Sequence, residues 1–402
     1  MKEIKPGYKA TPIGILPRDW EVKKLGENAI IKGRIGWKNL KQEEYTSEGP
    51  YLIAGKHIKN GIINWDLCDH ITEERYDESL EIALESGDVI FSKDGTLGNP
   101  ALITNLKQKA TINGTMMLVR VNKKVISSEY FYQILRSILF EKLIKMIKSG
   151  SSIPHIFQRD MNDFIVPIPP KEEQEKIAQI LMTWDDVIEK QEELIKQEKE
   201  FKKGMLQKIF SQKLRFKDEN GNDYPKWEEK KLGEIADIVK GKQLNKLDLD
   251  ASGEYPVING GVLPSGYYSE YNTLKNTITI SEGGNSCGYI NYIKTNFWAG
   301  GHCYILKFNN NYKEKYIYFI LKHNEKKIMN LRVGSGLPNI QKKDINSYML
   351  NFPSLPEQEK IADFLSTIDE KIEILEKKLE ELKEQKKGLM QKLLTGEVRV
   401  KS

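Results

Sequence analysis

The sequence has 402 residues, with 62 Lys and Arg against 57 Asp and Glu, which gives a formal net charge of +5. This length can hold more than one domain with its own core. No apolar run approaches the ~20 residues that a membrane span requires, and the first residues lack the pattern of a secretion signal. The three cysteines form no C-x-x-C pair, so we expect reduced thiols in a cytoplasmic protein, with no metal site.

The first predicted domain, head 1 (residues 1–168), contains short strands separated by turns, such as "DVIFSKDGTLGNPALI" and "TMMLVRV". One amphipathic helix is expected near its end, at 128–147. The glycine-rich loop 92–98 joins two apolar strands and can bring backbone N–H groups and small polar side chains close to a partner. An ordinary hairpin turn also favours Asp-Gly, so the loop by itself leaves both interpretations open.

Polar side chains in head 1 suggest contacts with nucleic acid. Cations following the stretch at 29–31 are candidates for phosphate contacts, and residues of the loop could hydrogen-bond to bases or phosphates. The candidates are Lys32, Arg34, Lys38, Lys93, Asp94, Gly95 and Thr96.

The next predicted element is a long helix at 169–216, whose sequence returns at 355–402. Aligned without gaps at an offset of 184 positions, residues 173–216 and 357–400 are identical at 20 of 44 positions. Apolar residues in the second copy alternate spacings of four and three, which is the seam of a coiled coil, with Lys386 as its one charged member. The first copy is less regular, because Gln191, Glu198 and Lys202 also lie on the seam.

The seam positions are the candidates for helix pairing and for docking a partner protein. They are Ile177, Leu181, Trp184, Ile188, Ile195, Ile361, Leu365, Ile368, Ile372, Leu375 and Leu379. Because neither helix is stable alone in water, we expect the two to pair with each other, antiparallel. The alternative is that each helix packs only on its own head.

Head 2 (residues 217–354) lies between the two helices and repeats the order of head 1. Its loop "SEGGNSCG" (281–288) takes the place of 92–98, and an amphipathic helix is expected at 313–331. Each head carries a net charge of +3, which is compatible with a phosphate-facing surface. The candidates in head 2 are Lys240, Lys242, Glu282, Gly283, Asn285, Ser286 and His302.

The duplication predicts an α+β fold with an internal pseudo-twofold axis. It consists of two tandem α/β domains joined by two long antiparallel helices that form a coiled coil. The predicted segments are 1–168, 169–216, 217–354 and 355–402.

Several enzyme classes are disfavoured by missing motifs. The sequence has no G-x-x-x-x-G-K-[ST] phosphate loop, no G-x-G-x-x-G that opens a helix and no Asn-Pro-Pro-aromatic motif. No catalytic constellation occurs in both halves, as a duplicated enzyme would require. We therefore expect no catalytic residues and no cofactor in this chain.

At this point the chain resembles the specificity (S) subunit of type I restriction-modification enzymes. The likeness rests on "PRDWEVKKLGE" and "YPKWEEKKLGE" opening the heads, and on "IPPKEEQEKIAQIL" and "FPSLPEQEKIADFL" entering the long helices. "KKGMLQKIF" and "KKGLMQKLLTGEV" close those helices, so the resemblance covers essentially the whole chain.

The resemblance implies two target recognition domains, each reading half of a bipartite, asymmetric double-stranded DNA sequence. The coiled coil would fix the gap between the halves and dock two methyltransferase (M) subunits, joined in restricting systems by two restriction (R) subunits. S-adenosylmethionine, ATP and Mg would belong to those partners, and the S subunit would be non-catalytic and cytoplasmic, with no membrane contact.

The sequence also leaves two other interpretations open. A coiled-coil scaffold whose heads bind protein predicts no DNA-sequence preference. An enzyme with an unrecognised site predicts turnover by the chain alone, which alanine at Asp94 or Glu282 should abolish.

Overall fold

A computed structural model describes residues 4–34, 40–150, 152–250, 252–308, 312–334, 336 and 338–400. The chain divides into two compact units. Unit 1 comprises Met1–Gln191 and Lys378–Ser402, and unit 2 comprises Glu192–Lys377. Each unit therefore combines one head with half of each long helix, α5 (Lys171–Phe210) and α10 (Leu355–Leu394).

Head 1 is built on two small sheets. The four-stranded antiparallel sheet has the order β10-β9-β12-β4, and the three-stranded sheet has the order β11-β5-β8, with β11 parallel to β5. The strands are β4 (Ala29–Gly33), β9 (Val89–Ser92), β10 (Gly98–Leu102), β12 (Met116–Val121), β5 (Thr46–Ile53), β8 (Asp69–His70) and β11 (Ala110–Ile112). Three antiparallel pairs complete the head, namely β1 (Tyr8–Thr11) with β2 (Gly14–Pro17), β3 (Glu21–Lys24) with β13 (Ile165–Ile168), and β6 (Ile58–Lys59) with β7 (Ile62–Ile63).

Head 2 repeats the two sheets and the β3–β13 pair of head 1, whereas the pairs β1–β2 and β6–β7 have no counterpart among the described strands of head 2. Its sheets have the orders β15-β21-β18-β19 and β17-β16-β20, again with one parallel pair, β16 with β20. The strands are β15 (Ala236–Lys240), β18 (Thr277–Ser281), β19 (Ile290–Ile293), β21 (Cys303–Phe308), β16 (Tyr255–Ile258), β17 (Gly266–Tyr268) and β20 (Trp298–Ala299), with β14 (Glu228–Lys231) paired to β22 (Met349–Phe352). The predicted α+β fold of two tandem domains is therefore confirmed.

The helix expected at 128–147 is two helices, α2 (Ser128–Ile134) and α3 (Ile138–Ser149). Ser137 separates them, because its hydroxyl donates to Ile134 O and accepts from Leu139 N. The helix expected at 313–331 is likewise α7 (Glu314–His323) and α8 (Glu325–Met329). Asn324 lies at that break, with its side-chain amide donating to Ile320 O. Shorter helices are α1 (Glu73–Asp77), α4 (Gln158–Asn162), α6 (Leu232–Ile235) and α9 (Lys342–Asn346).

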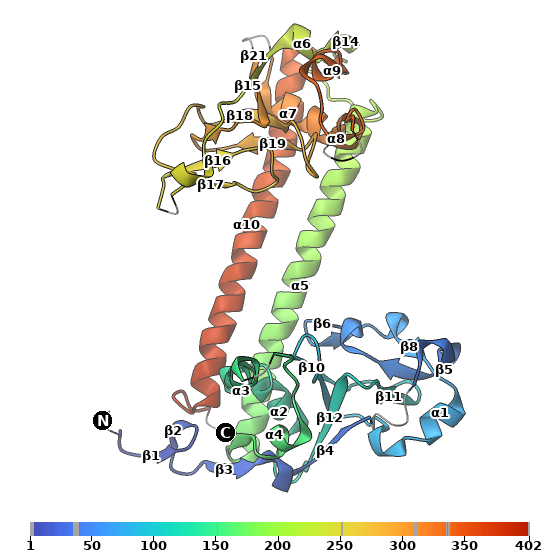
Figure 1. Cartoon of the computed structure of the whole chain (residues 1–402), viewed down its shortest axis with the longest axis vertical. Coiled ribbons are helices and arrows are strands. Elements are labelled where there is room, and N and C mark those ends of the chain that lie inside the picture. The colour runs from blue at the N-terminus through green and yellow to red at the C-terminus, as the bar shows by residue number, and fades with distance from the viewer. Residues whose placement is uncertain are drawn as a thin grey trace. The chain divides into compact units, whose positions relative to one another are not determined.

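The long helices run antiparallel within each unit (Figure 1). In unit 1, Asp185 of α5 pairs with Lys386 of α10. In unit 2, Glu198 pairs with Lys371 at 2.6 Å and Lys202 pairs with Asp369. Partner numbers fall along α10 as they rise along α5, which fixes the opposite directions. No helix in the described part of the chain is both long and apolar enough to span a membrane.

Each core joins a head to both long helices. In unit 1, Trp20 and Tyr130 of the head share one buried cluster with Ile177 of α5 and Leu393 of α10. In unit 2, the corresponding cluster contains residues of head 2, α5 and α10, and Ile361 and Leu365 are fully buried in it. The helices therefore pack on each other as well as on the heads, so the expected antiparallel pairing is confirmed, and packing of each helix on its own head alone is not what the structure shows.

Candidate nucleic-acid interface

The loop 92–98 of head 1 is anchored at its base by backbone hydrogen bonds. Lys93 N and Asp94 N donate to Thr115 O at 2.9 and 3.3 Å, and Ile156 N donates to Lys93 O at 3.0 Å. The Asp94 carboxylate contacts Lys93 Nζ at 3.1 Å through one oxygen and His155 Nδ1 through the other. His155 was not among the predicted residues, and it ties the loop to the segment that follows α3.

The tip of this loop faces solvent. Gly95 has φ +67°, a left-handed conformation that suits glycine, and no atom lies within 4 Å of a Cβ built there. Thr96 is exposed, and so is Lys32 on the neighbouring strand β4. These positions can approach a partner without rearrangement of the head.

Arg34 does not occupy the surface position that the sequence suggested. Its side chain is only 8% exposed, and its Nε donates to Ile112 O at 3.3 Å. Burial, followed by the nearby Arg75 charge, lowers the pKa of Arg34. Its guanidinium is thus inside head 1 and not offered to phosphates. Lys38, a further candidate, lies outside the described residues.

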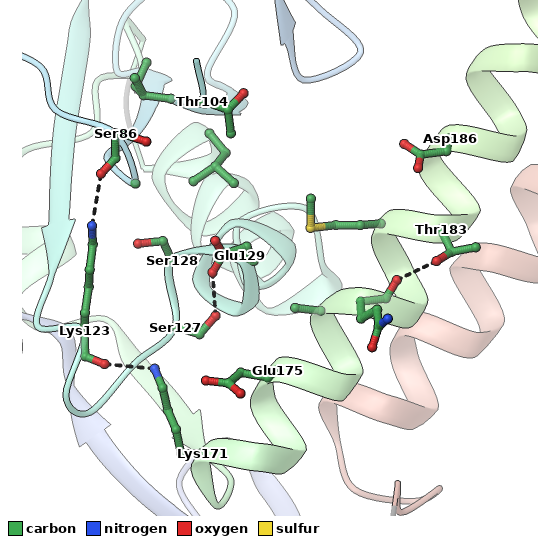
Figure 2. Close-up of a pocket in the computed structure, with 16 residues that line it drawn as sticks. Ser86, Thr104, Lys123, Ser127, Ser128, Glu129, Lys171, Glu175, Thr183 and Asp186 are labelled. Carbon is green, nitrogen blue, oxygen red and sulfur yellow. Dashed lines mark hydrogen bonds between the residues drawn. The ribbon is translucent and has the colours of Figure 1, made fainter. Parts of the chain in front are cut away.

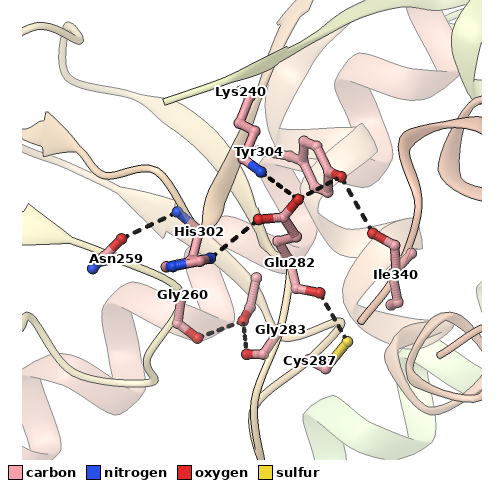
Figure 3. A network of polar contacts seen from close by, with 10 residues as sticks. Lys240, Asn259, Gly260, Glu282, Gly283, Cys287, His302, Tyr304 and Ile340 are labelled. Carbon is pink, nitrogen blue, oxygen red and sulfur yellow. Dashed lines mark hydrogen bonds and ion pairs between the residues drawn. The ribbon is translucent and has the colours of Figure 1, made fainter. Parts of the chain in front are cut away.

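The loop 281–288 of head 2 is organised around one buried carboxylate, that of Glu282 (Figure 3). Lys240 Nζ lies 2.6 Å from Glu282 Oε1, and Tyr304 OH donates to the same oxygen at 3.1 Å. His302 Nδ1 lies 3.3 Å from Glu282 Oε2.

Glu282 is 6% exposed and has its oxygens engaged, so it holds Lys240 and His302 in place and does not meet bases itself. Burial raises the pKa of Glu282, but the hydrogen bonds from Lys240 and Tyr304 outweigh it, and the net pKa is lowered. The carboxylate is therefore the charged anchor of this loop.

The remaining predicted residues of head 2 form the exposed rim around this anchor. The side chain of His302 is 62% exposed and that of Lys240 51%. Asn285 and Lys242 are also exposed. Gly283 instead forms a backbone bridge inside the head, to Asn339.

A second loop of head 2 reaches the same rim and was missed from the sequence. Ser286 Oγ donates to Gly260 O at 2.6 Å, and His302 N donates to Asn259 Oδ1 at 3.1 Å. Two residues beyond Gly260, Val262 and Leu263 are 52% and 77% exposed. Exposed apolar side chains thus follow directly on the segment that contacts the rim.

The two loops are held by the same backbone hydrogen bonds but carry side chains of different charge. Glu282 N donates to His302 O, and Ile340 N donates to Glu282 O, as Lys93 does with Thr115 and Ile156. Lys93 in head 1 and Glu282 in head 2 therefore occupy the same place. Likewise His155 of head 1 and Asn339 of head 2 are 184 positions apart and contact equivalent parts of the two loops. The offset of the repeat could have pointed to this segment.

The repeated "EQEKIA" begins with Glu173 in one copy and Glu357 in the other, and each of these carboxylates binds an arginine from the other copy of the repeat. We call each such carboxylate–arginine contact a swapped clamp. The buried carboxylate of Glu173 accepts from Trp20 Nε1 at 3.0 Å and from Arg399 Nε and Nη2 at 2.8 and 2.9 Å. Arg399 belongs to the other copy of the repeat, because it follows α10. Each helix start is thus held by the residue that follows the end of the other helix.

The second clamp reproduces the first at the same offset. Glu357, fully buried, accepts from Trp227 Nε1 at 3.1 Å and from Arg215 Nε and Nη2 at 3.1 and 2.6 Å. The next residue is repeated too, since Gln174 Nε2 and Gln358 Nε2 each donate at 2.9 Å to the carbonyl of a preceding proline. These contacts show that the repeated sequence builds the same joint in each unit.

A groove of about 670 Å³ lies between head 1 and the first turns of α5 (Figure 2). Lys123 Nζ donates to Ser86 O at 3.0 Å, and Lys171 Nζ donates to the carbonyl of Lys123 at 2.9 Å. The carboxylates of Glu129, Glu175 and Asp186 also line it. With three carboxylates against two lysines, the lining has a small excess of negative charge, which makes it less suited to a polyanion.

The seam residues are mostly covered within the chain. Ile177, Leu181, Ile195, Ile361, Leu365, Ile368 and Ile372 are at most 7% exposed. Trp184, Ile188, Leu375 and Leu379 are partly exposed. The large exposed apolar residues of the long helices are instead Val187, Leu194, Phe201, Leu355 and Ile374. A partner on the helices would therefore meet these residues more readily than the seam.

Within the described residues, no group of three or more His, Cys, Asp or Glu side chains is arranged to hold a metal ion. Cys68, Cys287 and Cys303 are buried free thiols. Burial raises the pKa of Cys68 and of Cys303 to about 12, which leaves these thiols protonated and unreactive at neutral pH.

Comparisons with known proteins agree with one another. The family model described as "Type I restriction modification DNA specificity domain" matches residues 17–198 and 224–384. The chain is 27% identical to the MjaVIII type I restriction enzyme specificity subunit of Methanocaldococcus jannaschii, over 96% of this chain and 95% of that protein. It is 28% identical to a putative MjaX specificity subunit from the same organism, over 98% and 97%.

A solved structure of a type I restriction-modification S subunit from M. genitalium has the same fold. It aligns with a TM-score of 0.63 and 21% identity, and covers 93% of this chain and 96% of that one.

Proposed function

The chain belongs to the type I restriction-modification DNA specificity family, and from this membership we propose that its two heads each read one half of a bipartite, asymmetric DNA target. The observation that carries the proposal is the pair of loops, 92–98 and 281–288, on one repeated backbone frame. Lys93 stands in one loop where Glu282 stands in the other. Equal frames with unequal side chains are what two different half-sites require.

The contacts with DNA would be divided between positioning and reading. The exposed cations Lys32, Lys240 and Lys242 suit phosphates, and their effect should weaken with salt. Thr96, Asn285 and His302 carry hydrogen-bonding groups at the exposed rims and suit base edges. Arg34 and Glu282 would act from inside the heads, by shaping and holding the surface.

The long helices would fix the gap between the half-sites and dock two M subunits. A helix rises by about 1.5 Å per residue, and the clamps of Glu173 and Glu357 hold each head on the helix starts. The two equivalent clamps give each unit the same joint between head and helices, which supports the docking of two identical M chains, one on each unit. The groove between head 1 and α5, with its small excess of negative charge, would be a further surface for protein.

The chain would supply specificity without chemistry. S-adenosylmethionine would be bound by the M subunits, and ATP and Mg by R subunits in a restricting system. The strongest candidates for a catalytic carboxylate, Asp94 and Glu282, are tied up in ion pairs that build their loops. The alternative of a protein-binding scaffold without DNA preference is not favoured, because the family to which this chain belongs is described by its DNA specificity domain.

The test is methylome sequencing of a host that expresses this chain with its M subunit, compared with a host that expresses M alone. We expect a new adenine-methylation motif of two short halves around a fixed gap. A chain carrying Thr96→Ala and Asp94→Ala should change only one half, and Asn285→Ala only the other. A soluble complex of S with M that produces no new motif would overturn the proposal.

A further inference from the structure

Asp185 of α5 is the meeting point of three parts of unit 1. Its carboxylate pairs with Lys386 of α10 through one oxygen. Its other oxygen lies 2.6 Å from Arg136 Nη1 and accepts from Gln133 Nε2 at 3.1 Å, both at the end of α2 in head 1. One side chain thus binds head 1, α5 and α10 together.

Lys386 occupies a position that a coiled coil normally gives to an apolar residue. It is 6% exposed, and burial lowers its pKa. A buried cation is tolerated only where a partner meets it, so it disfavours every arrangement of the helices that separates it from Asp185. An apolar residue at this position would tolerate small shifts.

The same pair occurs in unit 2, 184 positions away in both members. Asp369 of α10 pairs with Lys202 of α5. Lys202 Nζ also lies 5.4 Å from the ring centroid of Phe319, on α7 of head 2. Each Asp–Lys pair therefore contacts the helix by which its own head packs on the long helices.

We propose that the Asp185–Lys386 and Asp369–Lys202 pairs are positioning locks that hold each head at one angle and one axial position on its helices, and so restrict the DNA target to a single gap length. This inference rests on the proposed function. One base pair moves a half-site by about 3.4 Å and rotates it by roughly 35°, so a head free to shift would accept neighbouring gap lengths.

The two locks differ in strength. In unit 1, Asp185 receives two hydrogen-bonding groups from head 1 in addition to Lys386. In unit 2, the pair contacts head 2 through a cation–π contact of Lys202 with Phe319, without an ion pair to the head among the described residues. Releasing the first lock should therefore change gap selection more than releasing the second.

The experiment uses the complex of the full chain with its M subunit, and reads the methylome. In Asp185→Leu with Lys386→Leu, apolar packing replaces the pair, so the helices stay together. We expect methylation at targets whose gap is one base pair longer or shorter to rise at least tenfold over wild type. The control, Lys199→Leu with Glu376→Leu, removes an ion pair that is about half exposed on both sides and should leave the gap unchanged.

A second variant, Arg136→Met, releases the head side of the lock and leaves Lys386 paired, which covers the case in which the double variant does not fold. Both half-sites should still be read by it, with a broadened gap. If either folded variant methylates the wild-type gap alone, the locks do not set the gap and the inference is wrong. The failure of the proposed function looks different, because wild type itself would then show no bipartite motif.

Discussion

Replacing Arg399 with alanine tests the swapped clamp on unit 1. The guanidinium donates twice to Glu173, whose side chain is 5% exposed, and twice to Asp19, at 3.0 and 2.6 Å. In Arg399→Ala the Glu173 carboxylate stays buried, with Trp20 as its remaining side-chain donor. The variant should therefore lose stability in unit 1 out of proportion to the few contacts removed.

The size of the loss follows from burial. Removing one partner of a fully buried ion pair costs about 3–5 kcal/mol. Because the Arg399 side chain is 36% exposed, solvent screening reduces this to about 2–3 kcal/mol. For a unit of roughly 200 residues, that corresponds to a fall in Tm of about 5–10 °C.

Calorimetry of the purified chain measures the change, with Lys392→Ala, at an exposed position in the last turn of α10, as the control. A double-mutant cycle with Glu173→Gln separates the effect of the Glu173 charge from the loss of the other Arg399 contacts. A neutral amide needs no countercharge, so Arg399→Ala in that background should cost only about 1 kcal/mol. An equal cost in both backgrounds would refute the claim that an uncompensated buried carboxylate causes the loss.

Three further outcomes are expected. Burial lowers the pKa of Lys386 in the folded chain below its value in the unfolded chain, so between these two pKa values the unfolded chain binds more protons. The free energy of unfolding of wild type, relative to that of Lys386→Met, should therefore rise with pH up to ~10.4. Denaturant titrations at pH 7 and pH 10 that give the same difference would contradict this. Glu282→Gln should weaken the grip on Lys240 and reduce methylation through the half-site of head 2 by about tenfold, while targets altered in the other half respond as in wild type. Leu263→Ser should weaken DNA binding about threefold by removing an apolar contact with bases, as measured by titration with a labelled duplex. The control is Leu274→Ser, because Leu274 is 65% exposed elsewhere on head 2, and this variant should bind the duplex as wild type does.

The arrangement of heads and long helices along the chain could be predicted from the sequence, because the sequence contains this arrangement twice. An offset of 184 residues carried the two long helices, and the likeness upstream, in a shifted register, carried the order of the heads and the equivalence of the two loops. Seam charges at Lys386 and Lys202 were visible, but their partners were not. Antiparallel pairing brings Asp185 to Lys386 over 201 residues of sequence, and no local pattern reports such a distance.

The chemistry of the loops was less accessible, for the same reason. Glu282 stands in a loop that looks exposed, yet Lys240 and Tyr304 reach it from strands β15 and β21 through sheet register. Arg34 comes directly after strand β4, two residues from the exposed Lys32, and still turns into the head. Burial of a single charged side chain depends on long-range contacts that composition and spacing do not contain.

The swapped clamps have a consequence for how such proteins can diversify. The clamps that seat each head on the helices are made by repeated residues, Glu173 with Arg399 and Glu357 with Arg215. The tips of the loops that face solvent take no part in those contacts. A gene could therefore exchange one whole head for another at the repeated segments and keep both clamps. A chain with a new DNA specificity would then arise on the same pair of long helices.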